Sequence, residues 1–254
     1  MNEALIRDTI SEFQAVLGDN EWQFLNRVYS GGIASYQARL RQYGFERMER
    51  VLDAGCGFGQ WALALAELNA NVEALDDSSI RVVFIKELQK RLGLPGLKPS
   101  KGSIERVPFP DGAFDGLWCY QSFFLSDWKN TLREFRRVLK PGGLLYLNAN
   151  SHGWYRFIWE TSHNRTSDFD PRLTVAKAYM NTWRYENGHL IEKGAPIIIA
   201  PDDLENVLDS LGFKDIRRAK EGYANLPSDA VANPFLKGEY GGDLAVYEVL
   251  ARKV

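Results

Sequence analysis

Apolar positions recur with a helical period over the first 45 residues of the chain. They lie three or four residues apart, which places them on one face of a helix, and the first of them are Ile6, Ile10, Phe13 and Leu17. An aromatic stretch follows, and the Gly31-Gly32 pair predicts a break in it. We therefore expect residues 1–45 to form a helical cap.

Short apolar runs and amphipathic helix patterns alternate from about residue 50 to residue 150. The predicted strands begin at Val51, Val72, Leu97, Phe114 and Leu144, and the predicted helices cover residues 61–68, 78–92 and 127–139. The turn at residues 140–143, with the sequence KPGG, is expected to end the last helix. Such alternation implies right-handed crossovers and a parallel sheet with helices on both faces. It predicts an α/β protein with a Rossmann-like core over residues 46–150.

The alternation lapses over residues 151–200 and then resumes. Pro201 begins a helix pattern that Gly212 ends, and strands are expected at 213–219 and 244–251. The second of these strands is too apolar for an exposed edge. We interpret residues 151–200 as an insertion and residues 201–254 as the C-terminal part of the core sheet.

A glycine-rich loop follows the first predicted strand, in the sequence VLDAGCGFGQ at residues 51–60. Glycines allow a sharp turn and a close approach to a ligand, and the helix that follows offers unpaired N–H groups at its start. Asp76 ends the next strand, where a carboxylate can accept hydrogen bonds from two ribose hydroxyls. The pattern predicts a site for a nucleoside-containing cofactor. A tight turn that binds nothing is the structural alternative.

The spacing of the loop bears on which cofactor is bound. A dinucleotide fingerprint has the form G-x-G-x-x-G/A, and here Gln60 occupies its last position. Asp53 would repel a pyrophosphate but suits the ammonium and sulfonium of S-adenosylmethionine (SAM). The loop therefore favours SAM over NAD.

Four segments resemble the class I SAM-dependent methyltransferases, most of all the subgroup with quinone-biosynthesis and natural-product enzymes. The matching segments are VLDAGCGFGQ (51–60), NVEALDDSS (71–79), IERVPFPDGAFDGLW (104–118) and LREFRRVLKPGG (132–143). The resemblance implies a seven-stranded, mostly parallel sheet with one antiparallel strand, here the last one. It also implies SAM as cofactor, with S-adenosylhomocysteine (SAH) as the product.

The resemblance assigns cofactor-binding roles to the glycine loop and its acidic partner. Asp53, Ala54, Gly55 and Gly57 would line the methionine end of SAM, and Asp76 would hold the ribose.

It also assigns roles to residues further along the core. Asp77 would lie against the adenine, where the family usually has an apolar side chain, and Ser103 stands where it often has an Asp. Ser103 and the backbone N–H of Ile104 can still serve the adenine. Cys119 and Tyr120 would face the methionine amino group and the transferring methyl group.

Cys119 has a second interpretation, because nucleic-acid cytosine methyltransferases use a nucleophilic Cys in this region. Trp118 precedes it where those enzymes have Pro, which favours a small buried residue. The Pro-Pro-aromatic loop used for planar exocyclic amines is absent as well, which argues against adenine and similar amide targets.

The insertion at 151–200 is rich in aromatic and basic residues and holds all the histidines of the chain. One interpretation is a lid over the acceptor that stacks on it or clamps an anionic group. The other is a small satellite core with a solvated basic rim. His152 follows the last strand of the core and could accept a proton as general base, with His163 and Tyr120 as further candidates. A lone histidine is often structural instead. The histidine spacing predicts no metal site.

Composition and charge exclude several classes of protein. The 254 residues include 31 basic and 33 acidic side chains, a net charge of -2, without a polybasic tract, so we expect no nucleic-acid partner. Cys56 and Cys119 form no CxxC pair, which fits a reducing compartment. We expect no signal peptide, no membrane span and a cytoplasmic location.

The sequence thus predicts a methyltransferase that acts on a small molecule by in-line displacement. Aromatic, sugar-like and anionic acceptors all remain open, as does the oligomeric state. An RNA or protein methyltransferase is disfavoured by the balanced charge, and an NAD-linked oxidoreductase by Gln60 and Asp53. A SAM-binding protein without catalysis stays open as an alternative.

Overall fold

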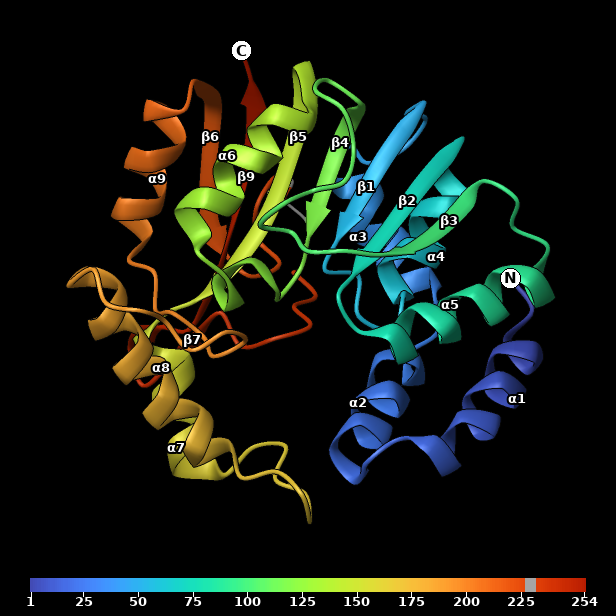
Figure 1. Ribbon diagram of the computed structural model, residues 1–254, viewed down its shortest axis with the longest axis horizontal. Coiled ribbons are helices and arrows are strands. Elements are labelled where there is room, and N and C mark those ends of the chain that lie inside the picture. Colours follow the sequence, from blue (N-terminus) through green and yellow to red (C-terminus); the bar gives the residue numbers. More distant parts are fainter. Residues whose placement is uncertain (227–231) are drawn as a thin grey trace.

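A seven-stranded sheet forms the centre of the protein, which a computed structural model describes over residues 1–226 and 232–254 (Figure 1). The strand order is β3-β2-β1-β4-β5-β9-β6. The bounds are β1 Arg50–Ala54, β2 Asn71–Asp76, β3 Leu97–Lys101, β4 Phe114–Cys119, β5 Leu139–Asn150, β6 Phe213–Lys220 and β9 Val246–Lys253. This order and the alternation of strands with helices confirm the predicted Rossmann-like α/β fold.

The direction of each strand follows from its pairing. β1, β2, β3, β4 and β5 pair in parallel, whereas β9 pairs antiparallel with both β5 and β6. The prediction that the last strand is the antiparallel one is therefore confirmed. β9 runs between two neighbours and is almost wholly buried, as its apolar sequence required.

Helices cover both faces of the sheet and its carboxyl edge (Figure 1). Their bounds are α1 Glu3–Phe13, α2 Asp19–Ser30, α3 Ala34–Gln42, α4 Gln60–Leu68, α5 Ser79–Leu92, α6 Trp128–Val138, α7 His152–Thr161, α8 Pro171–Glu186 and α9 Pro201–Ser210. Short 3-10 turns lie at Gln14–Val16 and Phe123–Leu125.

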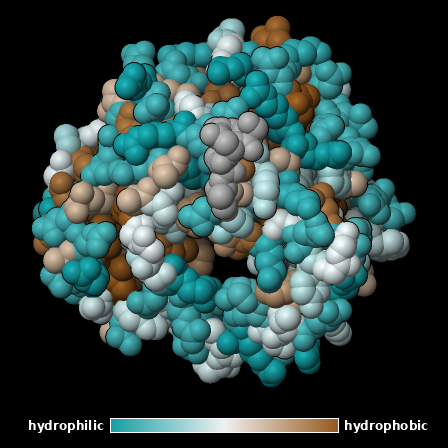
Figure 2. All heavy atoms as spheres, turned by 180° about the vertical axis from the view of Figure 1, so that it is seen from behind, coloured by the Kyte–Doolittle hydropathy of each residue, from teal (hydrophilic) through white to brown (hydrophobic). Residues whose placement is uncertain are grey.

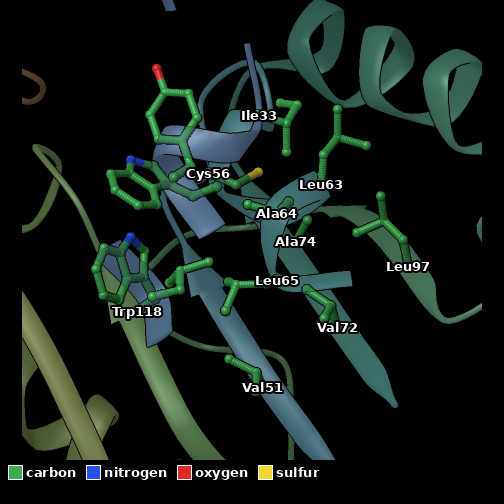
Figure 3. Packing of buried hydrophobic residues seen from close by; sticks show 14 of the residues in the cluster. Ile33, Val51, Cys56, Leu63, Ala64, Leu65, Val72, Ala74, Leu97 and Trp118 are labelled. Atoms are coloured by element: carbon green, nitrogen blue, oxygen red, sulfur yellow. The ribbon is translucent and has the colours of Figure 1, made fainter. Parts of the chain in front are cut away.

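Alternate residues of each strand enter different cores, as the period of two in a strand requires. Val51 packs with helices α3, α4 and α5, whereas its neighbour Leu52 packs with helices α6 and α9. Figure 3 shows the first of these cores, where Leu65 lies near Val51 and Val72, Leu63 lies nearer to Ile33 and Leu97, and Trp118 lies at the side of β4.

Two details differ from the sequence-based expectation. β5 begins at Leu139 rather than at Leu144, because Leu139 already pairs with Phe114 before the register shifts to Gly116 and Leu144. The KPGG turn therefore lies inside the strand as an irregularity, with Gly142 in the left-handed region at φ 76°. A two-stranded hairpin, β7 (Glu239–Tyr240) with β8 (Asp243–Leu244), was not predicted at all.

The insertion at 151–200 contains two helices with a small core of their own. Tyr155, Phe157 and Ile158 of α7 pack with Val175 and Ala178 of α8. The carboxyl ends of the parallel strands point toward α2 on one side and α7 on the other (Figure 1). Over residues 1–226 and 232–254, no helix is both long and apolar enough to cross a bilayer.

Candidate functional site

A cavity of about 700 Å³ opens at the carboxyl edge of the sheet. Figure 2 shows the molecule hollowed in its lower part, in the region where Figure 1 places α2 and α7. The wall includes Phe24, Arg27, Val28, Tyr36, Gly55, Gly57, Gln60, Trp61, Asp76, Asp77, Arg81, Gly102, Ser103, Ile104, Glu105, Tyr120, Gln121, Ser122, Trp154, His163, Asn164, Lys193, Phe235 and Leu236. Segments from both ends of the chain therefore meet at one site.

The loop between β1 and α4 forms one end of this cavity. Its three glycines have φ angles of 72°, 56° and 82° at Gly55, Gly57 and Gly59, which L side chains rarely adopt. The amides of Gly55 and Cys56 donate to the carbonyl of Leu75 at 2.8 and 3.0 Å, so the loop is tied to the end of β2.

Asp76 connects the glycine loop to the start of α5. One carboxylate oxygen accepts from the amide of Gly57 at 2.9 Å, and the other accepts from the amide of Ser78 at 2.9 Å. Burial raises the pKa of Asp76, while these two amides and Arg81 oppose the rise. The carboxylate is 5% exposed, lines the cavity and keeps lone pairs for a ligand's hydroxyls.

The loop has room for a ligand above it but none below. The nearest atom to a Cβ built on Gly57 would be a ring carbon of Phe24 at 4.0 Å, so Gly57 faces open space. A Cβ on Gly55 would lie 2.2 Å from the hydroxyl oxygen of Ser122, which donates to the carbonyl of Ala54 at 3.0 Å. An adenosine fits this cradle, because a bare backbone and an acidic acceptor face the same space.

Three of the predicted cofactor residues lie beneath the cradle rather than on the cavity wall. Asp53 is 1% exposed, and one of its carboxylate oxygens has no hydrogen-bond partner among the described residues. Burial, followed by the charge of Asp76, raises the pKa of Asp53 well above the usual value. Ala54 is fully buried. Cys119 is also fully buried, its thiol lies 3.1 Å from the Ser122 hydroxyl, and burial raises its pKa to about 12. That pKa favours the small buried residue over the nucleophile.

Asp77, Ser103 and Ile104 line the cavity beside Asp76. The side chain of Asp77 is 65% exposed and lies 4.0 Å from Lys193 of the insertion. The hydroxyl of Ser103 accepts from the amide of Glu105 at 3.2 Å. These residues form the side of the cavity that the predicted adenine would occupy.

Tyr120 lies on the wall where the cradle ends, and a buried network of charges lies behind it. Its hydroxyl donates to Glu221 at 3.2 Å, and Arg39 donates to the same carboxylate oxygen at 2.8 Å. Burial, followed by the charge of Glu221, raises the pKa of Tyr120 well above its ordinary value. Tyr120 is therefore a neutral phenol at physiological pH. The chain offered no sequence signal for Glu221, which lies 101 residues further on.

Aromatic rings form the other end of the cavity. Tyr36 stacks on Phe235 with the ring centroids 4.8 Å apart, and Trp61 lies 4.9 Å from Tyr120. Trp154 also lines the cavity, and Phe24 lies above Gly57 at the cradle. Trp154 belongs to the insertion whose aromatic residues the sequence predicts to cover the acceptor, whereas no motif marks Phe235.

The structure separates the two histidine candidates. His163 lines the cavity, where burial, Arg27 and Lys237 together lower the pKa of its ring. His152 lies outside the wall, on the exposed surface at the start of α7, with its Nδ1 3.3 Å from the hydroxyl of Tyr179. His152 was expected at the site as a general base, but its side chain does not line the cavity. The reason is that α7 begins at His152 itself and carries the side chain away from the strand ends.

The described part of the chain brings together no group of three His, Cys, Asp or Glu side chains able to hold a metal ion. The cavity instead offers backbone amides, the carboxylates of Asp76, Asp77 and Glu105, and aromatic rings at the end of a parallel sheet. Fold and site together define a nucleoside-binding α/β protein with a second, aromatic compartment beside the nucleoside.

Comparison with known proteins shows which proteins the core of this chain resembles. Residues 52–147 match the family described as a methyltransferase domain. The demethylmenaquinone methyltransferase of Geobacillus kaustophilus is 33% identical over 109 residues, 41% of this chain and 47% of that protein. A sterol 24-C-methyltransferase of Neurospora crassa is 33% identical over 125 residues, 45% of this chain and 33% of that protein. Residues 52–147 are therefore similar to a methyltransferase domain, and the chain spans about half or less of the length of these relatives.

Solved structures support the fold alone, because their sequences are distant. A geranyl diphosphate methyltransferase in complex with SAM has a TM-score of 0.59 at 15% identity, covering 87% of this chain and 85% of that chain. The [4+2]-cyclase SpnF has a TM-score of 0.57 at 20% identity, covering 87% of this chain and 80% of that chain.

Proposed function

We propose that this chain transfers a methyl group from SAM to a small-molecule acceptor by in-line displacement. The observation that carries the proposal is the convergence of the Gly55–Gly59 cradle and the Asp76 carboxylate on one end of a cavity that continues into an aromatic compartment. A cofactor in the first part would have its reactive end directed toward the second.

Roles for the residues around the cofactor follow from their positions. Gly55 and Gly57 would take the methionine end close to the backbone, and Asp76 would accept from the ribose hydroxyls. Ser103 and the amide of Ile104 would lie beside the adenine. Asp53, beneath the loop, would act on the cationic end through its charge rather than by direct contact. SAM supplies an electrophilic methyl group on a positively charged sulfonium.

The residues of the aromatic compartment would orient the acceptor and exclude water. Alignment of reacting atoms is worth roughly 7–11 kcal/mol of the barrier in favourable cases. The neutral hydroxyl of Tyr120 donates to Glu221, so its own lone pairs would face the acceptor and help to position it. Aromatic faces also favour a sulfonium by about 0.5–2 kcal/mol.

His163 is the side chain on the wall best suited to accept a proton from a hydroxyl or amine acceptor. Its lowered pKa keeps the ring neutral at physiological pH, when it can act as a base. Activity should then fall only as the pH drops below the ordinary histidine range. A pH profile of kcat/KM should show this acidic limb in the wild type and lose it in His163→Gln.

The dimensions of the cavity favour a small acceptor over an RNA or protein. A volume of about 700 Å³ lies in the range of small-molecule sites, roughly 300–1,000 Å³, and must also hold the cofactor. A SAM-binding protein without methyl transfer would show the same cradle, so catalysis itself needs a direct test.

Transfer of a labelled methyl group from SAM into a metabolite extract is that test. We expect SAH to bind the wild type and label to enter a small product. Asp76→Asn should weaken SAH binding by about 1.5–3 kcal/mol, roughly ten- to a hundredfold. The control is Asp209→Asn on α9, whose carboxylate pairs with Lys214 on the surface. SAH binding without label transfer would favour the non-catalytic alternative, and equal SAH affinity in both variants would contradict the proposed cradle.

A further inference from the structure

Three cationic side chains of Arg and Lys line the cavity, and they differ in what they contact. Arg81 donates to Glu21 at 2.7 Å, and Lys193 lies 4.0 Å from Asp77. Arg27, on α2, forms neither an ion pair nor a side-chain hydrogen bond with any described residue. Its guanidinium lies 5.9 Å from the ring centroid of Phe24 and on the cavity wall.

The surroundings of Arg27 make its lack of a partner notable. The residue is exposed but lies on the cavity wall beside the Phe24 ring, and burial lowers the pKa of its guanidinium. Partly desolvated cations are commonly matched by an anion, because an unmatched charge loses hydration without compensation. The Arg27 guanidinium can therefore bind an anion supplied by a ligand.

His163 and Lys237 lie near Arg27. Burial lowers the pKa of His163, and the charges of Arg27 and Lys237 lower it further, so both cations lie near its ring. Trp154 and Phe157 pack on its other sides, with ring centroids 6.1 and 4.9 Å away. These basic groups come from three separate parts of the chain.

The carboxylates of the wall lie near the other two cations, since Arg81 lowers the pKa of Asp76 and Lys193 lies 4.0 Å from Asp77. They are Asp76, Asp77 and Glu105, which follow the strands at the nucleoside side of the cavity. Arg27 is therefore the wall cation whose charge no described acidic side chain matches. A ligand with an anionic group at its far end would complement this arrangement.

We propose that the methyl acceptor carries an anionic group, a carboxylate or a phosphate, which binds to Arg27 at the mouth of the cavity. The inference rests on the proposed methyl transfer and adds the substrate class to it. Arg27 forms the anion contact, since a guanidinium matches carboxylate and phosphate oxygens in a bidentate geometry. Lys237 adds positive charge near that contact, and the neutral ring of His163 lies close to both.

The test uses the full chain as wild type, Arg27→Gln, Arg27→Lys and the control Arg7→Gln. Arg7 is also exposed, but it lies on α1 and pairs with Glu3 away from the cavity. SAH affinity is measured first by calorimetry and should agree within about twofold across the four proteins, because Arg27 does not touch the cradle.

Each protein is then given methyl-labelled SAM and a metabolite extract, and the labelled product is passed over an anion exchanger at neutral pH. We expect the product to be retained. Arg27→Gln should lower kcat/KM by about tenfold or more, mainly through KM. Arg27→Lys should recover part of that loss, and Arg7→Gln should match the wild type. Phosphatase treatment separates the two sources of charge, since only a phosphate loses retention.

The possible failures are distinguishable. If the wild type binds no SAH or transfers no label, the proposed function fails, and the inference fails with it. If label is transferred to a neutral or cationic product, or if Arg27→Gln performs like Arg7→Gln, methyl transfer stands and the anionic acceptor is overturned.

Discussion

Gly55 and Gly93 both adopt a left-handed backbone, with φ angles of 72° and 64°, but they differ in their surroundings. A Cβ at Gly93 would meet nothing within 4 Å, whereas one at Gly55 would lie 2.2 Å from the Ser122 hydroxyl. Gly93→Ala should therefore cost only the backbone strain, about 1–2 kcal/mol. Gly55→Ala should also displace Ser122 and the cradle above it.

Calorimetric SAH binding, with urea unfolding alongside it, tests this comparison. We expect Gly55→Ala to lose SAH affinity by about tenfold or more, a change of roughly 1.4 kcal/mol, and Gly93→Ala to bind as the wild type does. Equal affinities in the two variants would mean that the close approach at Gly55 has no part in ligand binding.

Burial of the Asp53 carboxylate lowers the stability of the ligand-free protein when this group is ionised. A carboxyl group with a raised folded-state pKa contributes most stability below its unfolded pKa, and the contribution is lost as the pH rises through the folded value. The pKa of Asp53 is raised well above 3.8 by burial and by Asp76. Asp53→Asn removes the ionisation and should stabilise the ligand-free protein at pH 8, by about 1–3 kcal/mol, with a smaller gain at pH 5.

The same substitution should weaken SAM binding, because it removes negative charge near the cationic end of the cofactor. Urea unfolding at the two pH values and SAM titration measure the two effects. A variant less stable than the wild type at pH 8 would show that the Asp53 carboxylate is not costly in the folded state.

At the scale of elements, helix α2 and the segment between α7 and α8 are joined across the cavity. α2 begins after Gly18, which has no side chain to cap the helix, and Asp168 accepts from the amide of Asn20 at 2.9 Å instead. Asp19 in turn accepts from the amide of Ser167 at 3.1 Å. A cap supplied 148 residues away therefore holds the insertion against the N-terminal helices.

Asp168→Ala should release this connection at a cost of about 0.5–2 kcal/mol, the usual value of an N-cap. We expect faster hydrogen exchange both at the start of α2 and over residues 162–170, and faster release of SAH. Asp170→Ala is the matched control, because Asp170 caps α8 in the same segment without contacting α2. Increased exchange in α2 after Asp170→Ala would contradict the assignment.

At the scale of the whole molecule, Arg39 joins three distant regions. It lies on α3 with 3% of its side chain exposed, donates to Glu221 after β6, and lies 3.7 Å from Glu248 of β9. It also donates to the carbonyl of Asn233 at 2.6 Å, which positions the segment that carries Phe235 onto the cavity wall.

Arg39→Met should destabilise the protein by about 3–5 kcal/mol, because it leaves buried carboxylates without their cation. Burial already raises the pKa of Glu248, so protonation would relieve the variant and its deficit should shrink as the pH falls. Arg41 lies two residues further along α3 and is exposed, so Arg41→Met should change stability by no more than about 0.5 kcal/mol. Chemical unfolding at pH 5 and pH 7.5 measures both, and a pH-independent deficit would contradict the electrostatic cause.

Much of the fold could be predicted from local patterns, because the spacing of apolar residues in a helix or strand depends only on residues close together in the sequence. The strands that carry the glycine loop and Asp76 were placed within a residue or two of their bounds. The KPGG turn was misjudged because pairing of Leu139 with Phe114 depends on another strand. The β7–β8 hairpin, two residues per strand, is too short to leave a periodic signal.

The sequence by itself determined the end of the sheet at which a ligand would bind and the nucleoside half of the site, since parallel strands bring their carboxyl ends together. Only the tertiary structure decided which side chains form the acceptor half. Arg27, His163 and Phe235 are far apart in the chain, and they meet because α2, the insertion and the last segment pack around the same edge of the sheet. Proximity to a strand suggested His152, but the direction of a side chain depends on the helix that carries it and on what that helix packs against.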